Sequence, residues 1–349
     1  MIECLSKTLG SARIYEPEAV RNAVLKIYME RVDLTGRVLR SDKITRARAI
    51  YIAKLDRLFS IIVDHIGRCA RLPKSSSMHP FYAEIAIIAS NGRYDELIDR
   101  CRRAIHLVTL LYREYRRKIL SSEDPSEIKR YVREYVGRSL SITRRGLRGI
   151  EVMRRAIDEI RKSPCISGDT INIVISGMPQ VGKSTLVSRI SSAKPETSPF
   201  PFTTKRVIMG HLVFGDRRIA VIDTPGILDR SLEEMNKIEL KAVSAIKHLA
   251  DIAIFMLDPR RGAYYDLEQQ LNVLKSVERI IDKSRIIVAI NKIDISSKEE
   301  IDACIELLKR IGYERVHLIS AIDGRGLDSL LKEALKVAEE RIKHKAGSI

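Results

Sequence analysis

The segment GMPQVGKS, residues 177–184, has the residue types and spacing of a loop that binds phosphate groups. Gly177 and Gly182 fill the glycine positions of the pattern GxxxxGK[ST], where they let the backbone fold tightly around an anion. Lys183 then reaches the outer phosphates, and Ser184 ligates Mg²⁺. Further contacts are expected from Met178, Pro179, Gln180, Val181 and Thr185. An ordinary glycine turn is the alternative, but the apolar strand before the motif and the helix after it favour phosphate binding.

A second motif, DTPG, begins at Asp223, 40 residues after Lys183. Asp223 stands at the end of a predicted strand, where it would hold Mg²⁺ through a water molecule. The Gly226 amide would face the terminal phosphate of a nucleotide. The nucleotide-contacting residues expected here are Asp223, Thr224, Pro225, Gly226 and Ile227. This order and spacing of the two motifs suits a nucleotide switch.

Two further motifs predict that the base is guanine. In NKID, Asp294 can accept both N–H groups of guanine's Watson–Crick edge, which adenine does not offer. Asn291 would tie this loop to the phosphate-binding loop, and Lys292 would lay its aliphatic stem over the ring. SAIDG follows the last predicted strand, and there Ala321 would donate its amide to the guanine carbonyl. Ser320 and Ile322 flank that amide, and the expected ligands are GTP or GDP with Mg²⁺.

The segment SPFPFTTKRV contains the two remaining candidate residues, Thr203 and Thr204. One threonine would complete the magnesium shell and sense the terminal phosphate, so that the loop orders with GTP and loosens after hydrolysis. We favour Thr204, which with Lys183 and Gly226 makes the predicted catalytic set, while Ser184, Thr204 and Asp223 make the predicted metal set. The alternative is that both hydroxyls only cap a turn.

The pattern after residue 166 predicts an α/β P-loop domain over residues 166–349, with a mostly parallel sheet and helices on both faces. The expected strands are residues 171–176, 219–223, 252–257, 286–290 and 316–319. Residues 207–214 look instead like one arm of a hairpin that adds an antiparallel edge. One final helix is expected over residues 327–344.

Residues 1–165 show a helical period instead, with apolar residues at spacings of three and four between charged ones. Helices are expected over residues 17–32, 43–71, 93–121 and 125–162, with a connecting helix or core segment from His79. The loops are short enough for antiparallel neighbours, which predicts an all-α bundle. The Pro-, Gly- and Ser-containing segment 163–170 separates it from the α/β half.

Positive charge is concentrated in the predicted bundle. Residues 1–165 hold 34 Lys and Arg against 20 Asp and Glu, a net of +14, out of +17 for the 349-residue chain. Such asymmetry predicts that this half binds a polyanion such as RNA. The absence of tryptophan and the small share of aromatic residues favour phosphate contacts along folded RNA over base stacking. A solvated surface without a partner is the alternative.

Composition narrows the cellular setting. No stretch approaches the roughly 20 apolar residues of a membrane span, and the first residues lack the layout of a signal peptide. The cysteines are scattered singly and suggest neither zinc nor a disulfide framework: Cys4, Cys69, Cys101, Cys165 and Cys304. We therefore expect a monomer in a reducing, cytoplasmic compartment, without membrane or DNA partners.

The quoted motifs resemble the translation-factor class of GTPases, and within it the Obg-related group, in which PFTT precedes DTPG. Residues 221–258, from VIDTPG to FMLD, look more narrowly like the nucleolar GTP-binding (Nog-type) family. That resemblance implies a helical domain joined to a GTPase domain and a role in assembly of the large ribosomal subunit, with ribosomal RNA as partner and a nucleolar location in eukaryotes. Only one helix is expected after residue 319, without the long C-terminal extension of eukaryotic members. In this respect the sequence resembles an archaeal-type member of the family.

Two positions depart from related enzymes. Gln180 stands where many relatives carry an asparagine associated with activation by monovalent cations, so the resemblance leaves potassium dependence open. Ile227 stands where Ras-like enzymes have the glutamine that orients the attacking water, and its side chain has no group that hydrogen-bonds. Slow intrinsic hydrolysis is the expectation.

The leading hypothesis is a GTP-switched factor of large-subunit assembly whose helical domain contacts ribosomal RNA. The alternative is a GTP-regulated protein whose cationic helices bind an anionic membrane surface, or another ribosome-linked partner. The bundle helices keep their apolar residues on what looks like a packing face, and no lipidation signal is present, which disfavours the membrane.

Overall fold

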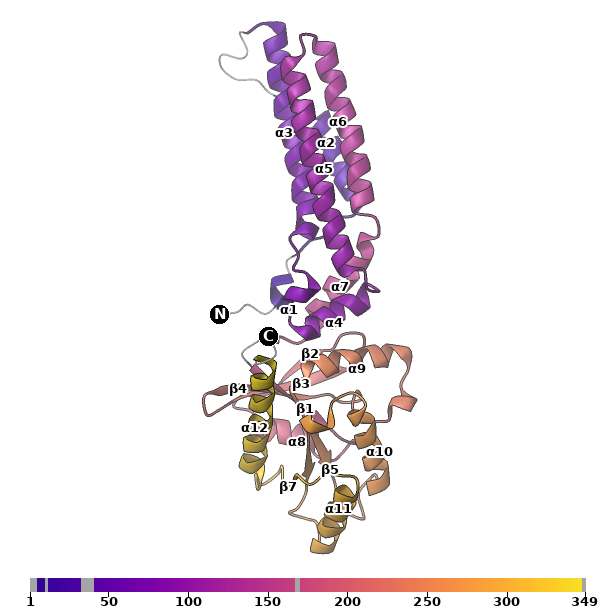
Figure 1. Cartoon of the computed structure of the whole chain (residues 1–349), viewed down its shortest axis with the longest axis vertical. Helices are drawn as coiled ribbons and strands as arrows, with labels where there is room; N and C mark the ends of the chain where they lie inside the picture. The colour runs from indigo at the N-terminus through magenta and orange to yellow at the C-terminus, as the bar shows by residue number, and fades with distance from the viewer. Residues whose placement is uncertain (1–4, 10–11, 33–40, 167–169, 347–349) are drawn as a thin grey trace. The chain divides into compact units, whose positions relative to one another are not determined.

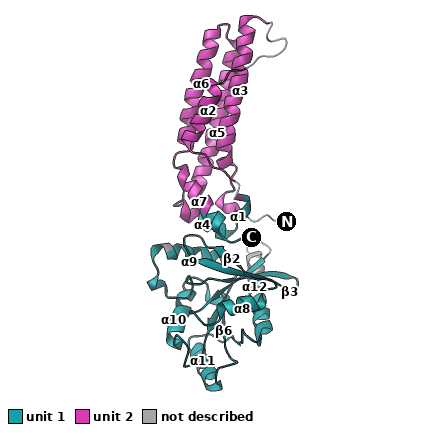
Figure 2. Ribbon diagram, turned by 180° about the vertical axis from the view of Figure 1, so that it is seen from behind, with its two compact units in different colours: residues 1–8, 79–85, 159–349 teal, residues 9–78, 86–158 magenta. Residues whose placement is uncertain are grey.

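The computed structural model describes residues 5–9, 12–32, 41–166 and 170–346. The chain divides into two compact units (Figure 2). A helical unit comprises residues 9–78 and 86–158, and an α/β unit comprises residues 1–8, 79–85 and 159–349. The short helix α1 (Leu5–Thr8) belongs to the α/β unit, whereas α4 (Pro80–Ala89) and α7 (Ile150–Lys162) have residues in both.

The helical unit is a bundle of long helices (Figure 1). Its members are α2 (Pro17–Met29), α3 (Lys43–Ala70), α5 (Tyr94–Ser121) and α6 (Pro125–Gly146), with a 3₁₀ turn at Ser75–Ser77. The starts of two helices are fixed by aspartates. Asp42 accepts the amides of Ile44 and Thr45 at 2.9 Å, and Asp124 accepts that of Ser126 at 2.8 Å. These side chains satisfy donors that have no partner inside the first helical turn.

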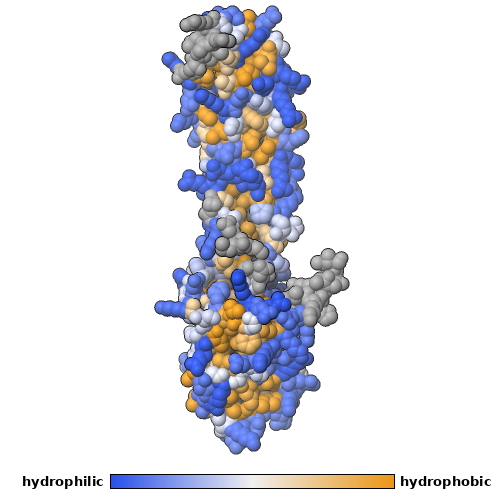
Figure 3. Space-filling model, turned by 90° about the vertical axis from the view of Figure 1, so that its left-hand side faces the viewer, coloured by the Kyte–Doolittle hydropathy of each residue, from blue (hydrophilic) through white to orange (hydrophobic). Residues whose placement is uncertain are grey.

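The core of the bundle is built from the apolar stripes that the spacing predicts. In α5, Leu97, Cys101, Val108 and Leu111 are buried, while the arginines of the other faces are exposed. Amphipathic helices are stabilised mainly by burying their apolar stripes against one another. Some apolar residues remain at the surface, where the space-filling view shows them between hydrophilic residues on one face of the helical unit (Figure 3).

The single helix predicted over residues 125–162 is wrong, because α6 ends at Gly146 and α7 begins at Ile150. Gly149 adopts φ +79°, in the left-handed region where glycine avoids the Cβ clash that other residues meet. Leu147 turns inward and is 1% exposed. The chain therefore leaves the helix at Gly149, and the break buries the Leu147 side chain.

The α/β unit contains a seven-stranded sheet in the order β2-β3-β4-β1-β5-β6-β7. The strands are β1 (Thr170–Ser176), β2 (Glu196–Pro199), β3 (Arg206–Phe214), β4 (Arg217–Asp223), β5 (Ile252–Leu257), β6 (Ile286–Ile290) and β7 (Val316–Leu318). Strands β4, β1, β5, β6 and β7 run parallel. The all-buried pattern of β5 and β6 is typical of such central strands.

The prediction that residues 207–214 form an arm of a hairpin is confirmed, but the prediction that this arm is the edge of the sheet is wrong. β3 pairs antiparallel with β4, but β2 pairs with the other side of β3 and forms the edge of the sheet. The sequence ETSP of β2 has no apolar alternation, so its periodicity gave no signal of a strand. Pro199 at the end of this strand suits an edge, because proline has no N–H to donate to a further neighbour.

The helices of this unit are α8 (Lys183–Ile190), α9 (Lys237–Leu249), α10 (Leu267–Glu278), α11 (Lys298–Arg310) and α12 (Leu327–Ala346), with 3₁₀ turns at Leu232–Glu234 and Lys283–Arg285. α8 packs on β3 and β4, α12 on β1 and β5, and α10 on β5. The carboxyl ends of parallel strands lie at one edge of the sheet, so the loops after β1, β4, β6 and β7 meet there.

Within residues 5–9, 12–32, 41–166 and 170–346, no helix has the length and apolar content needed to cross a membrane. The cysteine spacing suggested no disulfide framework, whereas Cys165 is disulfide-bonded in the structure. Cys69, Cys101 and Cys304 are buried free thiols. Single spacing along a chain does not reveal which cysteines approach each other in three dimensions.

Candidate nucleotide-binding site

The phosphate loop, residues 177–184, connects β1 to the first turn of α8. Gly177 adopts φ +134° and Gly182 φ +102°, and a Cβ at either position would collide with the Met256 carbonyl or the Asn291 amide group. Gln180 also has a positive φ, +67°. The two glycines are thus required by backbone conformation and by close neighbours, and the loop exposes the amino end of α8 to a ligand.

Lys183 is the first residue of α8, at the end of this loop, and is 8% exposed. Its Nζ donates to the carbonyls of Gly177 at 2.8 Å and Met178 at 2.9 Å. Burial lowers the pKa of Lys183, while the negative charge of Asp223 counteracts that effect. A partly desolvated ammonium group at the amino end of a helix is suited to bind an anion.

Asp223 and Ser184 form a pair of oxygen groups beside the loop. The Ser184 hydroxyl donates to Asp223 Oδ2 at 2.6 Å. Asp223 Oδ1 is buried and has no hydrogen-bond partner among the described residues, and burial raises the pKa of this carboxyl. An unpaired buried carboxylate oxygen beside a hydroxyl is the hard donor set that Mg²⁺ prefers, so these two residues fit the ion.

The two threonines lie in the threonine loop, residues 200–205, between β2 and β3. The Thr203 hydroxyl accepts the Lys205 amide at 3.1 Å, while Thr204 is exposed. The role of Thr204 at the metal stays a prediction. The loop is anchored at its start, because the Phe200 ring is buried and lies 5.9 Å from the Phe81 ring.

The DTPG loop, residues 224–236, joins β4 to α9. Thr224 is buried and Pro225 half-buried. Ile227 is 3% exposed, so its side chain packs into the interior. The Gly226 amide donates to Asp229 Oδ2 at 2.6 Å.

Three charged side chains that the motif analysis missed connect the two loops. Lys205 of the threonine loop donates to the Gly226 carbonyl and lies 3.3 Å from Glu239 of α9. Glu239 also pairs with Arg230 of the DTPG loop. Lys205 stands in the quoted TTKRV segment and Arg230 in ILDRS, but sequence spacing gives no sign that both reach one carboxylate.

The base-recognition loops after β6 and β7 meet the phosphate loop through Asn291. Its amide donates to the Val181 carbonyl at 2.8 Å, and its carbonyl accepts the Ala321 amide at 2.9 Å. The structure therefore brings NKID, SAIDG and the phosphate loop together. Ser320 is buried, whereas Asp294 and Ile322 are exposed.

Lys292 is held in place by a carboxylate that was not predicted. Its Nζ donates to the Gln180 carbonyl at 2.7 Å and to Asp258 Oδ2 at 2.8 Å. Asp258 directly follows β5 and is 3% exposed. Its place at the carboxyl end of a buried strand was the available sequence signal, and it fixes the lysine stem beside the base-recognition loop.

Comparison with known proteins now bears on this geometry. Residues 14–167 match the family described as NOG1 N-terminal helical domain, and residues 172–292 match 50S ribosome-binding GTPase. An uncharacterized protein of Methanocaldococcus jannaschii is 32% identical over 258 residues, which are 73% of this chain and 72% of that protein. The chain belongs to the NOG1 family. Its α/β unit therefore contains a GTPase domain, whose ligands are GTP or GDP with Mg²⁺.

Other NOG1-family comparisons differ in coverage. Nucleolar GTP-binding protein 1 of Drosophila melanogaster is 31% identical over 305 residues, 84% of this chain. The chain spans 46% of the length of that protein. A structure of putative nucleolar GTP-binding protein 1 from Plasmodium falciparum aligns with a TM-score of 0.45 and 24% identity, covering 52% of this chain and 93% of that one.

Proposed function

We propose that this chain is a GTP-hydrolysing switch in the assembly of the large ribosomal subunit, and that its helical unit binds ribosomal RNA. The names of the matched families and relatives, with their ribosome-binding GTPase and nucleolar GTP-binding descriptions, support the setting. The observation that carries the RNA contact is the net charge of +14 over residues 1–165.

The proposed RNA contact is the α5–α6 groove, a shallow hollow of about 270 Å³ on the helical unit. It is lined by Arg100, Arg103, Ala104, Leu107, Ile142, Arg145 and Gly146. Arg103 and Arg145 are exposed and form no ion pair within the described part of the chain. Guanidinium groups that are exposed and not engaged in an ion pair among the described residues are available to phosphate oxygens, which they bind in a bidentate manner.

Nucleotide state has a route from the threonine loop to the helices. The Phe202 amide donates to Glu159 of α7 at 2.9 Å, and Phe200 contacts Phe81 of α4. Both helices continue into the helical unit. If the threonine loop orders around GTP and Mg²⁺, these two contacts change with it. We infer that the GTPase domain reports its state to α4 and α7 in this way.

The RNA contact is tested with the 349-residue chain and large-subunit ribosomal RNA. The double variant Arg103→Ala, Arg145→Ala should weaken binding and lower the slope of log affinity against log salt by about 1 for each arginine that contacts a phosphate. The matched control is Arg310→Ala, Arg315→Ala, which removes the same charge from ion-paired positions on the α/β unit.

The two pairs of variants distinguish a site from bulk charge. Equal losses in both pairs would show that net charge alone attracts RNA, and the α5–α6 groove would be rejected. Flotation with anionic vesicles, without co-sedimentation with large-subunit particles, would support the membrane alternative instead.

A further inference from the structure

The donor expected to meet the terminal phosphate already has a ligand within the chain. The Gly226 N–H donates to Asp229 Oδ2 at 2.6 Å. A backbone amide bound to a carboxylate makes a charge-assisted hydrogen bond, about twice as strong as a neutral one. Gly226 has a single N–H, so a γ-phosphate oxygen and the Asp229 carboxylate compete for it.

The Asp229 charge also reaches the two groups that bind phosphate and metal. It adds to the burial that raises the pKa of Asp223, and it counteracts the burial that lowers the pKa of Lys183. The Asp229 carboxylate therefore lies near the region in which the negatively charged γ-phosphate would bind. The Asp229 carboxylate and a γ-phosphate would repel each other in this partly desolvated region, so binding of the phosphate would displace the carboxylate.

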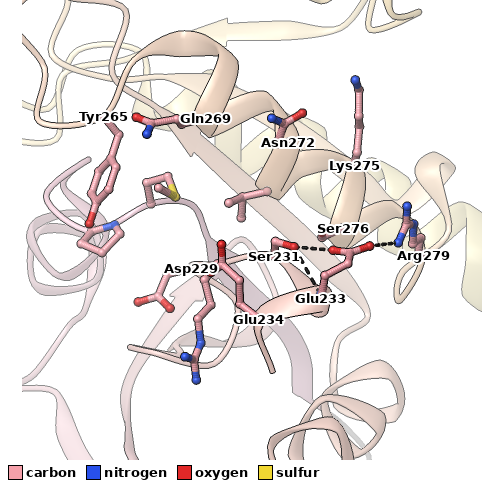
Figure 4. Close-up of a pocket in the computed structure, with 14 residues that line it drawn as sticks. Asp229, Ser231, Glu233, Glu234, Tyr265, Gln269, Asn272, Lys275, Ser276 and Arg279 are labelled. Atoms are coloured by element: carbon pink, nitrogen blue, oxygen red, sulfur yellow. Dashed lines mark hydrogen bonds and ion pairs between the residues drawn. The ribbon is translucent and has the colours of Figure 1, made fainter. Parts of the chain in front are cut away.

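A neighbouring cavity gives the carboxylate somewhere to go. This cavity of about 680 Å³ is lined by Met178 and Pro179 of the phosphate loop, by the DTPG loop from Asp229, and by α10. In Figure 4, Asp229 lies in the DTPG loop across from Gln269 and Asn272 of α10. Asp229 is half-buried and itself lines this cavity, so the space beside its carboxylate is open rather than filled by core side chains.

We propose that Asp229 is an internal ligand of the terminal-phosphate site and sets the ratio of GTP to GDP affinity. GDP has no γ-phosphate, so its binding leaves the Asp229–Gly226 bond intact. GTP must replace that bond. An interaction present only in the nucleotide-free and GDP-bound states lowers the affinity for GTP by its own free energy. The proposal rests on the assignment of this site to guanine nucleotides.

The test is calorimetric titration of the full chain with GDP and with a non-hydrolysable GTP analogue, both with Mg²⁺. Asp229→Ala should raise the affinity for the analogue about tenfold and change the affinity for GDP less than about twofold. Asp229→Asn, which keeps an acceptor oxygen but no charge, should fall between. Unchanged GDP binding also shows that the variant is folded.

Glu234→Gln is the matched control, because Glu234 lines the same cavity in the same loop and makes no bond to Gly226. It should leave both affinities within about twofold of the wild type. Equal changes for both nucleotides in Asp229→Ala, or a weaker analogue affinity, would overturn the proposal. Wild-type protein that binds neither nucleotide would overturn the guanine-nucleotide assignment itself, and the proposal with it.

Discussion

At the scale of single residues, the exposed carboxylate of Asp294 is the group on which base selection is predicted to depend. Asp294→Asn replaces an acceptor with a donor at the guanine N–H groups, whereas xanthine offers a carbonyl there. We expect GTP affinity to fall about 100-fold or more, and xanthosine triphosphate to become the better ligand. Competition titration against a fluorescent guanine nucleotide measures both. Retained GTP affinity would refute the assignment of Asp294.

Asp223 carries a second residue-scale prediction, which concerns stability. Because burial raises the pKa of Asp223 in the fold, the unfolded chain releases this proton first. The associated stability is present below the unfolded pKa of about 3.9 and is lost as pH rises through the higher folded value. Asp223→Asn has no carboxyl to deprotonate at this position, so its free energy of unfolding should exceed that of the wild type by an amount that grows from pH 4 to pH 7.

We expect Asp223→Asn to be more stable than the wild type by about 1 kcal/mol at pH 7 and to lose Mg²⁺-dependent nucleotide binding. Urea denaturation without nucleotide or Mg²⁺, at several pH values, measures the first effect. Asp294→Asn, at an exposed position, is the control and should follow the wild type. A less stable Asp223→Asn at pH 7 would mean that Lys183 compensates the buried charge.

The residues that sequence reasoning missed share one property. Asp229, Lys205 and Asp258 act on backbone groups or on other site side chains, at distances that the fold sets. The motif residues were found because phosphate, metal and base impose fixed residue types at fixed spacing. No such rule fixes a residue that bonds to a glycine amide from within the same loop.

At the scale of elements, the packing of α5 on α6 depends on Gly146. A Cβ there would lie 2.6 Å from Ala104 Cβ, closer than two such atoms approach. Gly146→Ala should therefore force the helices apart and lower the free energy of unfolding by about 1–3 kcal/mol. Urea denaturation followed by circular dichroism measures it.

Gly137 provides the matched control, because it lies in the same helix with nothing near its missing Cβ. Gly137→Ala should stabilise α6 by up to about 1 kcal/mol, since alanine loses less backbone entropy on folding. If both substitutions stabilised the protein, helix propensity rather than helix–helix approach would control position 146.

Helices and strands with strong periodicity were predictable, and weak ones were not. The apolar runs gave β1, β5 and β6 to within a residue or two, because a strand buried on both faces needs continuous apolar side chains. β2 is held by backbone pairing alone, so its residues carry no pattern. The break between α6 and α7 depends on the left-handed conformation of Gly149. Because glycine also occurs within helices such as α6, its presence in the sequence did not mark this break.

At the scale of the whole molecule, the chain joins a strongly basic helical half to a GTPase half with little net charge. A positive surface raises the rate of encounter with an RNA particle and makes it salt-dependent. The Phe202 amide of the threonine loop donates to Glu159 of α7, and α7 is the helix through which we propose that the two units communicate. If the proposed RNA contact exists, linkage requires that any effect of nucleotide state on RNA affinity is matched by an equal effect of RNA on nucleotide affinity.

This coupling predicts how the full chain should hydrolyse GTP. Ile227 packs inward and orients no water, so the isolated protein should turn over slowly. Purified large-subunit precursors should raise the rate about tenfold or more at low salt, with the gain lost as salt rises. Single-turnover phosphate release with and without particles measures this. Arg103→Ala, Arg145→Ala should reduce the gain without changing the basal rate, whereas a fast isolated protein would contradict the need for a partner.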